Sequence, residues 1–146
     1  MIEVKQAETD DEIRSCHAVM RQLRPHHDRE HRFLERVRMQ QREGYRLVML
    51  SSDGEVAAVA GYRIGHNLAW GKYLYVDDLV TGEKSRSAGH GRKLMEWLLA
   101  KARAERCDEL HLDSGVQRFG AHRFYLREGM DITSHHFTIK LEERED

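Results

Sequence analysis

Residues 77–99, DDLVTGEKSRSAGHGRKLMEWLL, constrain the fold more than any other stretch of this chain. Residues 72–80, which overlap the beginning of this stretch, are rich in aromatic and β-branched side chains. They are apolar on both alternating sides, which predicts a strand buried on both faces. Beyond it, apolar residues recur every three or four positions at Leu94, Met95, Leu98, Leu99 and Ala102. That spacing predicts a helix with one apolar stripe.

The turn between this strand and this helix is built from small residues. Gly89 and Gly91 allow a tight turn, so that free N–H groups of the first helical turn can point together at an anion. Arg86 and Arg92 add positive charge on either side. Spacing alone leaves a plain loop and helix start equally open, because glycine turns are common. The NTPase loop GxxxxGK[ST] is absent, and GxGxxG fails because Leu94 occupies the third glycine position.

Length and charge limit the remaining classes. The 146 residues are enough for one domain, residues 1–146, with a single core. Because 24 Lys plus Arg balance 25 Asp plus Glu, no overall field favours nucleic acid or an anionic membrane. No apolar run approaches the roughly 18 residues of a spanning helix, and the first residues lack a leader pattern, so we expect a cytoplasmic protein. Cys16 and Cys107 show no metal or disulfide pattern and are expected to be reduced packing residues.

The other elements follow from periodicity and turn residues. We expect a helix capped by Thr9 or Asp10 and reaching Leu23, and a second helix capped by Asp28 and ended by Gly44. A strong hairpin turn at residues 53–54 joins two further strands. In chain order the remaining expected elements are strands at residues 2–6, 45–51, 55–64, 70–80 and 109–113 (the last parallel to its predecessor), a short helix at 121–128 and a last strand at 135–141.

Two motifs carry a resemblance to a known family. Arg86, Gly89 and Gly91 form an RxxGxG pattern that resembles the signature of the GNAT superfamily of acyl-CoA-dependent N-acetyltransferases, and residues 77–79 stand where that family often has Glu-Asp-Leu. Residues 120–125 and 128–130 are similar to its A-x-x-F-Y segment and the Gly-aliphatic pair that follows. Together with the element order, the resemblance covers the chain and implies an α/β fold: a mixed antiparallel and parallel sheet of about six to seven strands flanked by four helices.

The resemblance implies acetyl transfer from acetyl-CoA to a primary amine of a small molecule or peptide, by direct attack on the thioester and without a metal. A non-catalytic acyl-CoA-binding sensor is the alternative. The implied cofactor contacts are Leu79, Val80, Thr81, Arg86, Ser87, Ala88, Gly89, His90, Gly91, Arg92 and Ser114. One departure is Arg118, which stands where the family often has an Asn that contacts the pantetheine arm.

Two side chains are the candidate catalytic groups. The resemblance places Tyr125 at the CoA sulfur as an acid, and Asp77 at the position of a carboxylate that acts through water as a base. Because neighbours on a strand point to opposite faces, we expect only one of Asp77 and Asp78 to face the acceptor. A packed aromatic ring and a structural carboxylate are the plain alternatives.

The histidines suggest a metal site only weakly. His27 and His31 share helical spacing beside His26 and Asp28, but no third ligand has diagnostic spacing and three nearby arginines oppose a cation. In the matching fold this segment borders the acceptor site, so its residues either select the acceptor or are solvated.

A nucleotide- or nucleic-acid-binding module is disfavoured because the chain has no basic stripe. Exposed strand edges near the C-terminus are compatible with a homodimer.

Overall fold

The computed structural model describes residues 1–86 and 88–142. The chain divides into two compact units, Met1–Leu112 and Asp113–Asp146. Within the described residues, none of the helices combines the length and the apolar character that crossing a bilayer requires.

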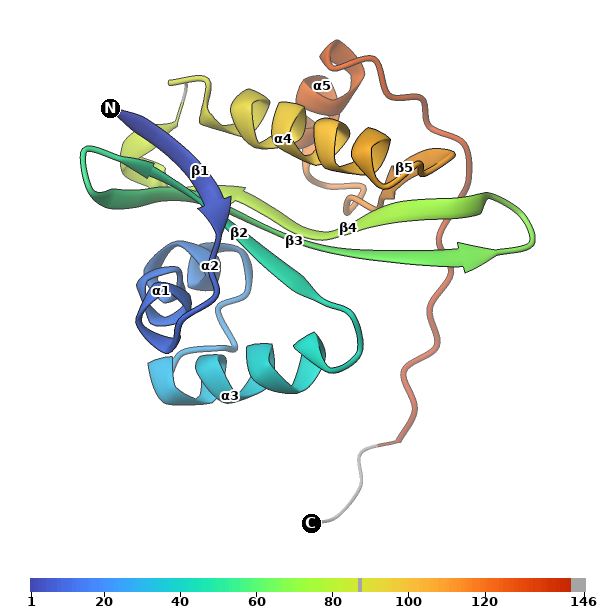
Figure 1. Ribbon diagram of the computed structural model, residues 1–146. Coiled ribbons are helices and arrows are strands. Elements are labelled where there is room, and N and C mark those ends of the chain that lie inside the picture. The colour runs from blue at the N-terminus through green and yellow to red at the C-terminus, as the bar shows by residue number, and fades with distance from the viewer. Residues whose placement is uncertain (87, 143–146) are drawn as a thin grey trace. The chain divides into compact units, whose positions relative to one another are not determined.

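The first unit is built on a five-stranded sheet in the order β1-β2-β3-β4-β5 (Figure 1). The first four strands pair antiparallel with their neighbours, and β5 pairs parallel to β4. The crossover through a helix predicted this parallel pairing, since a parallel connection must return to the same end of the sheet. The strands are β1 (Ile2–Gln6), β2 (Arg46–Ser52), β3 (Glu55–Asn67), β4 (Gly71–Thr81) and β5 (Glu109–Leu112).

Helices cover both faces of this sheet. Figure 1 shows α1 (Asp10–Ser15), α2 (His17–Leu23) and α3 (Glu30–Gln41) on one side and α4 (His90–Ala104) on the other. The first three helices share a core with one set of sheet residues, among them Leu47 and Val59. On the opposite face α4 buries Leu94 and Leu98 against Val48. Because the sheet is covered on both faces, its central strands are apolar on both alternating sides.

The helix predicted from Thr9 or Asp10 to Leu23 is two helices that meet at Cys16. Thr9 is the cap and forms a capping box with Glu12. The break follows from competition for one carbonyl: the Ser15 hydroxyl donates to the Glu12 oxygen at 2.5 Å, and the Cys16 N–H bonds Ile13 instead. Such side-chain bonds to the backbone interrupt regular helices.

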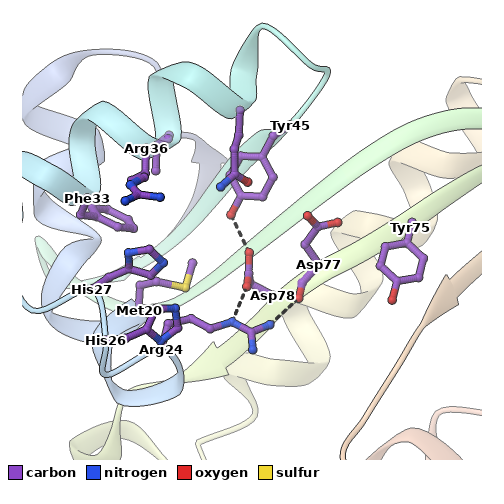
Figure 2. Close-up of a pocket in the computed structure, with 12 residues that line it drawn as sticks. Met20, Arg24, His26, His27, Phe33, Arg36, Tyr45, Tyr75, Asp77 and Asp78 are labelled. Carbon is purple, nitrogen blue, oxygen red and sulfur yellow. Dashed lines mark hydrogen bonds and ion pairs between the residues drawn. The ribbon is translucent and has the colours of Figure 1, made fainter. Parts of the chain in front are cut away.

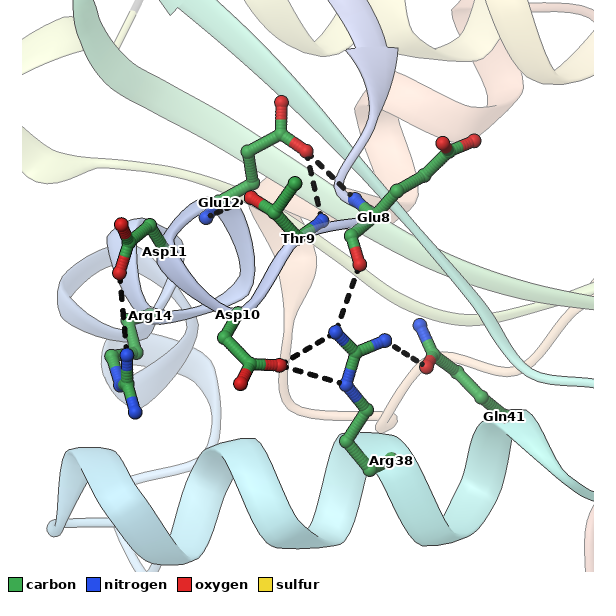
Figure 3. Close-up of polar contacts among 8 residues, drawn as sticks. All are labelled: Glu8, Thr9, Asp10, Asp11, Glu12, Arg14, Arg38 and Gln41. Carbon is green, nitrogen blue, oxygen red and sulfur yellow. Dashed lines mark hydrogen bonds and ion pairs between the residues drawn. The ribbon is translucent and has the colours of Figure 1, made fainter.

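The prediction that Asp28 caps α3 is wrong. Arg29 occupies the cap position and makes no side-chain capping bond. The helix is held instead by Arg38, whose guanidinium donates to Asp10 Oδ1 at 2.6 Å, to the Glu8 carbonyl at 2.9 Å and to Gln41 Oε1 at 2.9 Å (Figure 3). The hydrogen bond between Arg38 and Asp10 joins residues 28 positions apart, which explains why local capping rules did not predict it.

The second unit contains α5 (Phe119–Arg127) and no strand among its described residues, so the strand predicted at residues 135–141 is wrong. The sheet therefore has five strands instead of six or seven, and five α-helices instead of four are described. Alternation supplies Phe137, Ile139 and Leu141 for one face, yet these side chains are 91%, 87% and 87% exposed. A strand also needs a neighbouring backbone to pair with, which alternation does not supply.

Tyr45, the residue just before β2, lies directly over Gly61 of β3. The tyrosine is 3% exposed, and a Cβ added at Gly61 would overlap its ring and hydroxyl. Gly61 is therefore required by close approach of a side chain and not by a turn.

We expect Gly61→Ala to lower the free energy of unfolding by about 1–3 kcal/mol, as overpacking of a filled core typically does. Urea denaturation followed by circular dichroism measures this change. Gly120→Ala in α5 is the control, because an added Cβ there meets nothing within 4 Å. Equal denaturation midpoints for Gly61→Ala and the parent would contradict the close-approach interpretation.

Candidate active site

A β-bulge in β4 determines how the two neighbouring carboxylates point. Asp78 pairs with Gly61 and Val76 pairs with Tyr62, so Asp77 is an extra residue without a partner on β3. The bulge interrupts the alternation of side chains, and Asp77 and Asp78 line the same pocket (Figure 2). The expectation that only one of them faces this side is therefore wrong.

This pocket has a volume of about 380 Å³ and lies wholly in the first unit. Its walls come from α2, the α2–α3 link, α3, Tyr45 just before β2, and β4. Most of the lining residues are polar or charged, and Met20, Phe33 and Val37 form the apolar part. A concave site in which several polar groups converge beside an apolar part is a candidate for small-molecule binding.

Asp78 is held by two donors from different parts of the chain. The Tyr45 hydroxyl donates to Oδ2 at 2.8 Å, and Arg24 Nε donates to Oδ1 at 2.9 Å. Burial, followed by the charge of Asp78, raises the pKa of Tyr45 well above its usual value, so Tyr45 stays a donor. Arg24 also donates to the backbone oxygen of Asp77 at 2.9 Å, which fastens the bulge to the helical layer.

Asp77 has a separate cationic partner. Arg63 Nε donates to its Oδ2 at 2.9 Å, while Arg63 Nη2 donates to Gln40 at 2.9 Å. Burial raises the pKa of Asp77 and outweighs the opposing effect of Arg63. A raised pKa makes a carboxylate a better proton acceptor, which is the direction that general-base chemistry requires.

The histidines of the α2–α3 link form another wall of the pocket. The rings of His26 and His27 lie 4.2 Å apart, and the His27 carbonyl is hydrogen-bonded to His17 Nε2 at 2.7 Å. Burial lowers the pKa of His27, and the neighbouring charges of His26 and Arg36 lower it further. Among residues 1–86 and 88–142, no three His, Cys, Asp or Glu side chains are grouped so that they could hold a metal ion.

The glycine turn begins α4 as the sequence predicts. Gly89 occupies the cap position in the left-handed region (φ 80°), and nothing lies within 4 Å of a Cβ added there. His90, the first helical residue, is 6% exposed, and its Nδ1 has no hydrogen-bond partner among the described residues. Ala88 and Arg92 are exposed, and Arg92 pairs with Glu96 at 3.4 Å.

The structure describes two of the three remaining predicted residues of this turn. Arg86 is exposed and follows a short 3₁₀ turn, Glu83–Ser85, while Gly91 is partly buried within α4. Ser87 lies outside the described residues.

The predicted strand positions Leu79, Val80 and Thr81 lie at the end of β4, beyond the bulge. Pairing between β4 and β5 ends at Val76 with Leu112, while β4 continues to Thr81. This end of β4 therefore pairs with β3 but not with β5.

Tyr125 and Ser114 belong to the second unit. The ring of Tyr125, in α5, meets that of Phe124 edge-on at 5.5 Å. Burial raises the pKa of its hydroxyl, and Arg118 opposes the rise, so the tyrosine stays protonated at neutral pH. Arg118, the departure from the family pattern, thus interacts with Tyr125 itself. The Ser114 hydroxyl is buried without a hydrogen-bond partner among residues 1–86 and 88–142.

Sequence reasoning missed the residues that hold the carboxylates. Arg24, Tyr45 and Arg63 lie 54, 33 and 14 residues from their Asp partners, and no local spacing announces such contacts. The bulge was missed as well, although two adjacent acids inside an otherwise apolar strand were a usable signal.

The comparisons with known proteins agree with this fold. Residues 8–130 match the model of the Acetyltransferase (GNAT) family. The chain is 33% identical to the uncharacterized N-acetyltransferase YhdJ of Bacillus subtilis (strain 168) over 139 residues, 94% of this chain and 97% of that protein. It is 30% identical to the aminoalkylphosphonate N-acetyltransferase of Salmonella typhimurium (strain LT2), over 66% of this chain and 62% of that protein.

Among solved structures, AAC(6')-Iy, in a complex with a CoA bisubstrate analogue, superposes with a TM-score of 0.82. It covers 97% of this chain and 99% of its own, at 14% sequence identity, which shows a shared fold. The family match spans most of the chain and both of its units, and so does the YhdJ similarity. This chain belongs to the GNAT acetyltransferase family.

Proposed function

We propose that this protein transfers the acetyl group of acetyl-CoA to the primary amine of a small molecule or peptide, by direct attack of the amine on the thioester. The observation that carries this proposal is the bulge in β4, which turns two adjacent carboxylates into one pocket, next to an end of β4 that pairs with β3 but not with β5. An amine is protonated at neutral pH, so a nearby carboxylate is the group that acyl transfer to nitrogen requires. We infer also that residues 1–146 act as one domain, since the family model spans both units.

The residues present fit acetyl-CoA as the co-substrate. The β4 backbone at Leu79, Val80 and Thr81 continues past β5, so it can pair with the pantetheine amides like an added strand. The start of α4 offers free N–H groups and the open space beside Gly89 for the pyrophosphate. Within the described residues His90 Nδ1, at the start of α4, has no hydrogen-bond partner, so it is a polar atom that a ligand could satisfy, and the Ser114 hydroxyl of the second unit is another.

Two residues receive catalytic roles in this proposal. Asp77 takes the proton of the amine, directly or through water, because burial raises its pKa toward the range of a useful base. Tyr125 donates a hydrogen bond, and then a proton, to the departing thiolate of CoA, because its raised pKa keeps the hydroxyl protonated. The nitrogen–carbonyl bond forms as the carbon–sulfur bond breaks, so no covalent enzyme intermediate is needed.

The relatives support a small-molecule amine as the acceptor. The name of the Salmonella relative specifies an aminoalkylphosphonate, and AAC(6')-Iy is an aminoglycoside N-acetyltransferase. The pocket of about 380 Å³ suits an acceptor of modest size.

Release of free thiol from acetyl-CoA across a panel of amines tests the proposed function. We expect amine-dependent thiol release together with an N-acetylated product identified by mass spectrometry. Hydrolysis without added amine is the background control. Binding of CoA without turnover of any amine would instead indicate the sensor alternative, and competition by ATP or DNA would indicate a nucleotide-binding module.

We expect Gly89→Val to raise the KM for acetyl-CoA at least tenfold or to abolish binding. Valine is strained at φ 80° and covers the backbone that the pyrophosphate must approach. Calorimetric affinity for CoA, measured on a protein whose circular dichroism is native, checks this outcome. Gly120→Ala is the control, and unchanged CoA affinity in folded Gly89→Val would disprove the proposed contact.

We expect Asp77→Asn to lower kcat by about 10²–10⁴, the usual contribution of a positioned base. The contribution requires the ionised carboxylate, so in the parent it is lost as pH falls through the raised pKa of Asp77; the variant lacks this limb of the pH profile. CoA affinity should stay nearly unchanged. If folded Asp78→Asn loses more kcat than Asp77→Asn does, Asp78 is the base.

We expect Tyr125→Phe to lower kcat and kcat/KM together by about 10²–10⁴, while CoA affinity and stability change little. The ring that meets Phe124 is kept and only the hydroxyl is removed. A thiol pKa near about 8.5 makes the thiolate a tolerable leaving group, so activity is reduced and not abolished. Single-turnover kinetics provide the measurement, and a rate within about threefold of the parent would make Tyr125 a packing residue.

A further inference from the structure

The pocket between α2, α3 and β4 contains one more guanidinium than its carboxylates use. Asp78 pairs with Arg24 at 2.9 Å, and Asp77 pairs with Arg63 at 2.9 Å. Arg36, from α3, also lines the pocket, and within residues 1–86 and 88–142 it has no ion pair or hydrogen bond to an acidic side chain. Arg63 lies outside the lining, so Arg36 is the guanidinium of the lining that has no carboxylate partner among the described residues.

This charge lies on the helical side of the pocket, away from the strand. Figure 2 shows Arg36 beside Phe33 and His27, whereas Asp77 projects from β4 on the other side of Asp78. Burial, and then the charges of His26 and Arg36, lower the pKa of His27, which disfavours a charged imidazole at this end of the pocket. The pocket thus has a cationic end on α3 and a carboxylate end on β4.

We propose that the acceptor is an amine that also carries an anionic group, a carboxylate or a phosphate ester, and that Arg36 binds that group while the amine lies toward Asp77. This inference names the substrate class of the proposed N-acetyltransferase and rests on that function. A guanidinium presents paired N–H donors that match two oxygens of such an anion. The contact orients the amine, so Arg36 is a specificity-determining residue and takes no part in proton transfer.

The same charges disfavour polyamines as acceptors. A second ammonium group would meet Arg36, and both carboxylates of the pocket already have arginine partners. Like charges brought together in a partly desolvated site cost binding free energy. A neutral amine would be bound without a partner for Arg36.

Three amines of similar length separate these cases: 3-aminopropanoate, its neutral counterpart 3-aminopropanamide, and 1,3-diaminopropane. A fourth, 2-aminoethyl phosphate, distinguishes a phosphate from a carboxylate as the preferred anion. We expect kcat/KM with acetyl-CoA to be highest for one of the two anionic amines and lowest for the diamine. Higher kcat/KM for the diamine or the amide than for both anionic amines would overturn the proposal.

The matched variants are Arg36→Gln and Arg103→Gln. Both remove one positive charge from an exposed helical position, but Arg103 lies on α4, which covers the opposite face of the sheet. We expect Arg36→Gln to reduce kcat/KM for the anionic amines by about ten- to a hundredfold, mainly through KM, as loss of a charged hydrogen bond does. The amide should lose less than threefold, and Arg103→Gln should change neither.

Arg36→Lys separates charge from geometry. It keeps the positive charge but loses the paired donors, so its kcat/KM for the anionic amines should lie between those of the parent and Arg36→Gln. An equal loss of kcat/KM for amide and anionic amines in Arg36→Gln would show that Arg36 acts on the fold and would overturn the proposal.

Direct binding keeps this test apart from that of the proposed function. Calorimetry measures the affinity of 3-aminopropanoate and 2-aminoethyl phosphate for the parent and for Arg36→Gln, without turnover. Binding that depends on Arg36, in a protein that acetylates no amine, would support the anion site and overturn the transferase. Turnover confined to neutral or cationic amines would support the transferase and overturn the anion site. If the protein showed neither binding nor turnover, both proposals would be overturned.

Discussion

The candidate active site depends on the extra residue in β4. Without the bulge at Asp77, alternation would send one of the two carboxylates to the opposite face of the sheet, where α4 packs. With it, both carboxylates enter one pocket, although carboxylates so close together repel each other unless cations compensate them. The bulge therefore creates both the site and its requirement for cationic partners.

Those partners connect the sheet to the helical layer. Arg24, at the end of α2, bonds both the Asp78 carboxylate and the backbone at the bulge, while Tyr45 reaches Asp78 across Gly61. A carboxylate held by charged and hydrogen-bonding donors loses less from burial than an unpaired one. The result is a fixed pair of carboxylates with distinct surroundings: Asp78 is bonded by two side chains, and Asp77 is bonded by one and has a raised pKa. That difference is why Asp77 is the better candidate for proton transfer.

The same packing leaves two features free for ligands. The end of β4 continues past β5, and the glycine turn presents the start of α4. The first follows from the length of β5, which is short and ends before the bulge. The excess charge of Arg36 is a property of the pocket wall on α3, separate from these features.

The sequence by itself determined the elements that rest on local chemistry. Periodicity predicted β1 and α4, the turn at Asp53 and Gly54 predicted the hairpin, and the RxxGxG and A-x-x-F-Y patterns indicated the GNAT family before any contact was known. These signals are local because hydrogen bonding in helices and turns joins residues that are close in the chain.

Only the tertiary structure decided the rest. Local patterns supplied neither a ladder partner for residues 135–141 nor the competition at Glu12 that divides the first helix. The bulge at Asp77 and the partners Arg24, Tyr45 and Arg63 were likewise invisible, because each depends on residues brought together from distant parts of the chain. The sequence showed which chemical groups were present, and long-range packing decided which of them share a pocket.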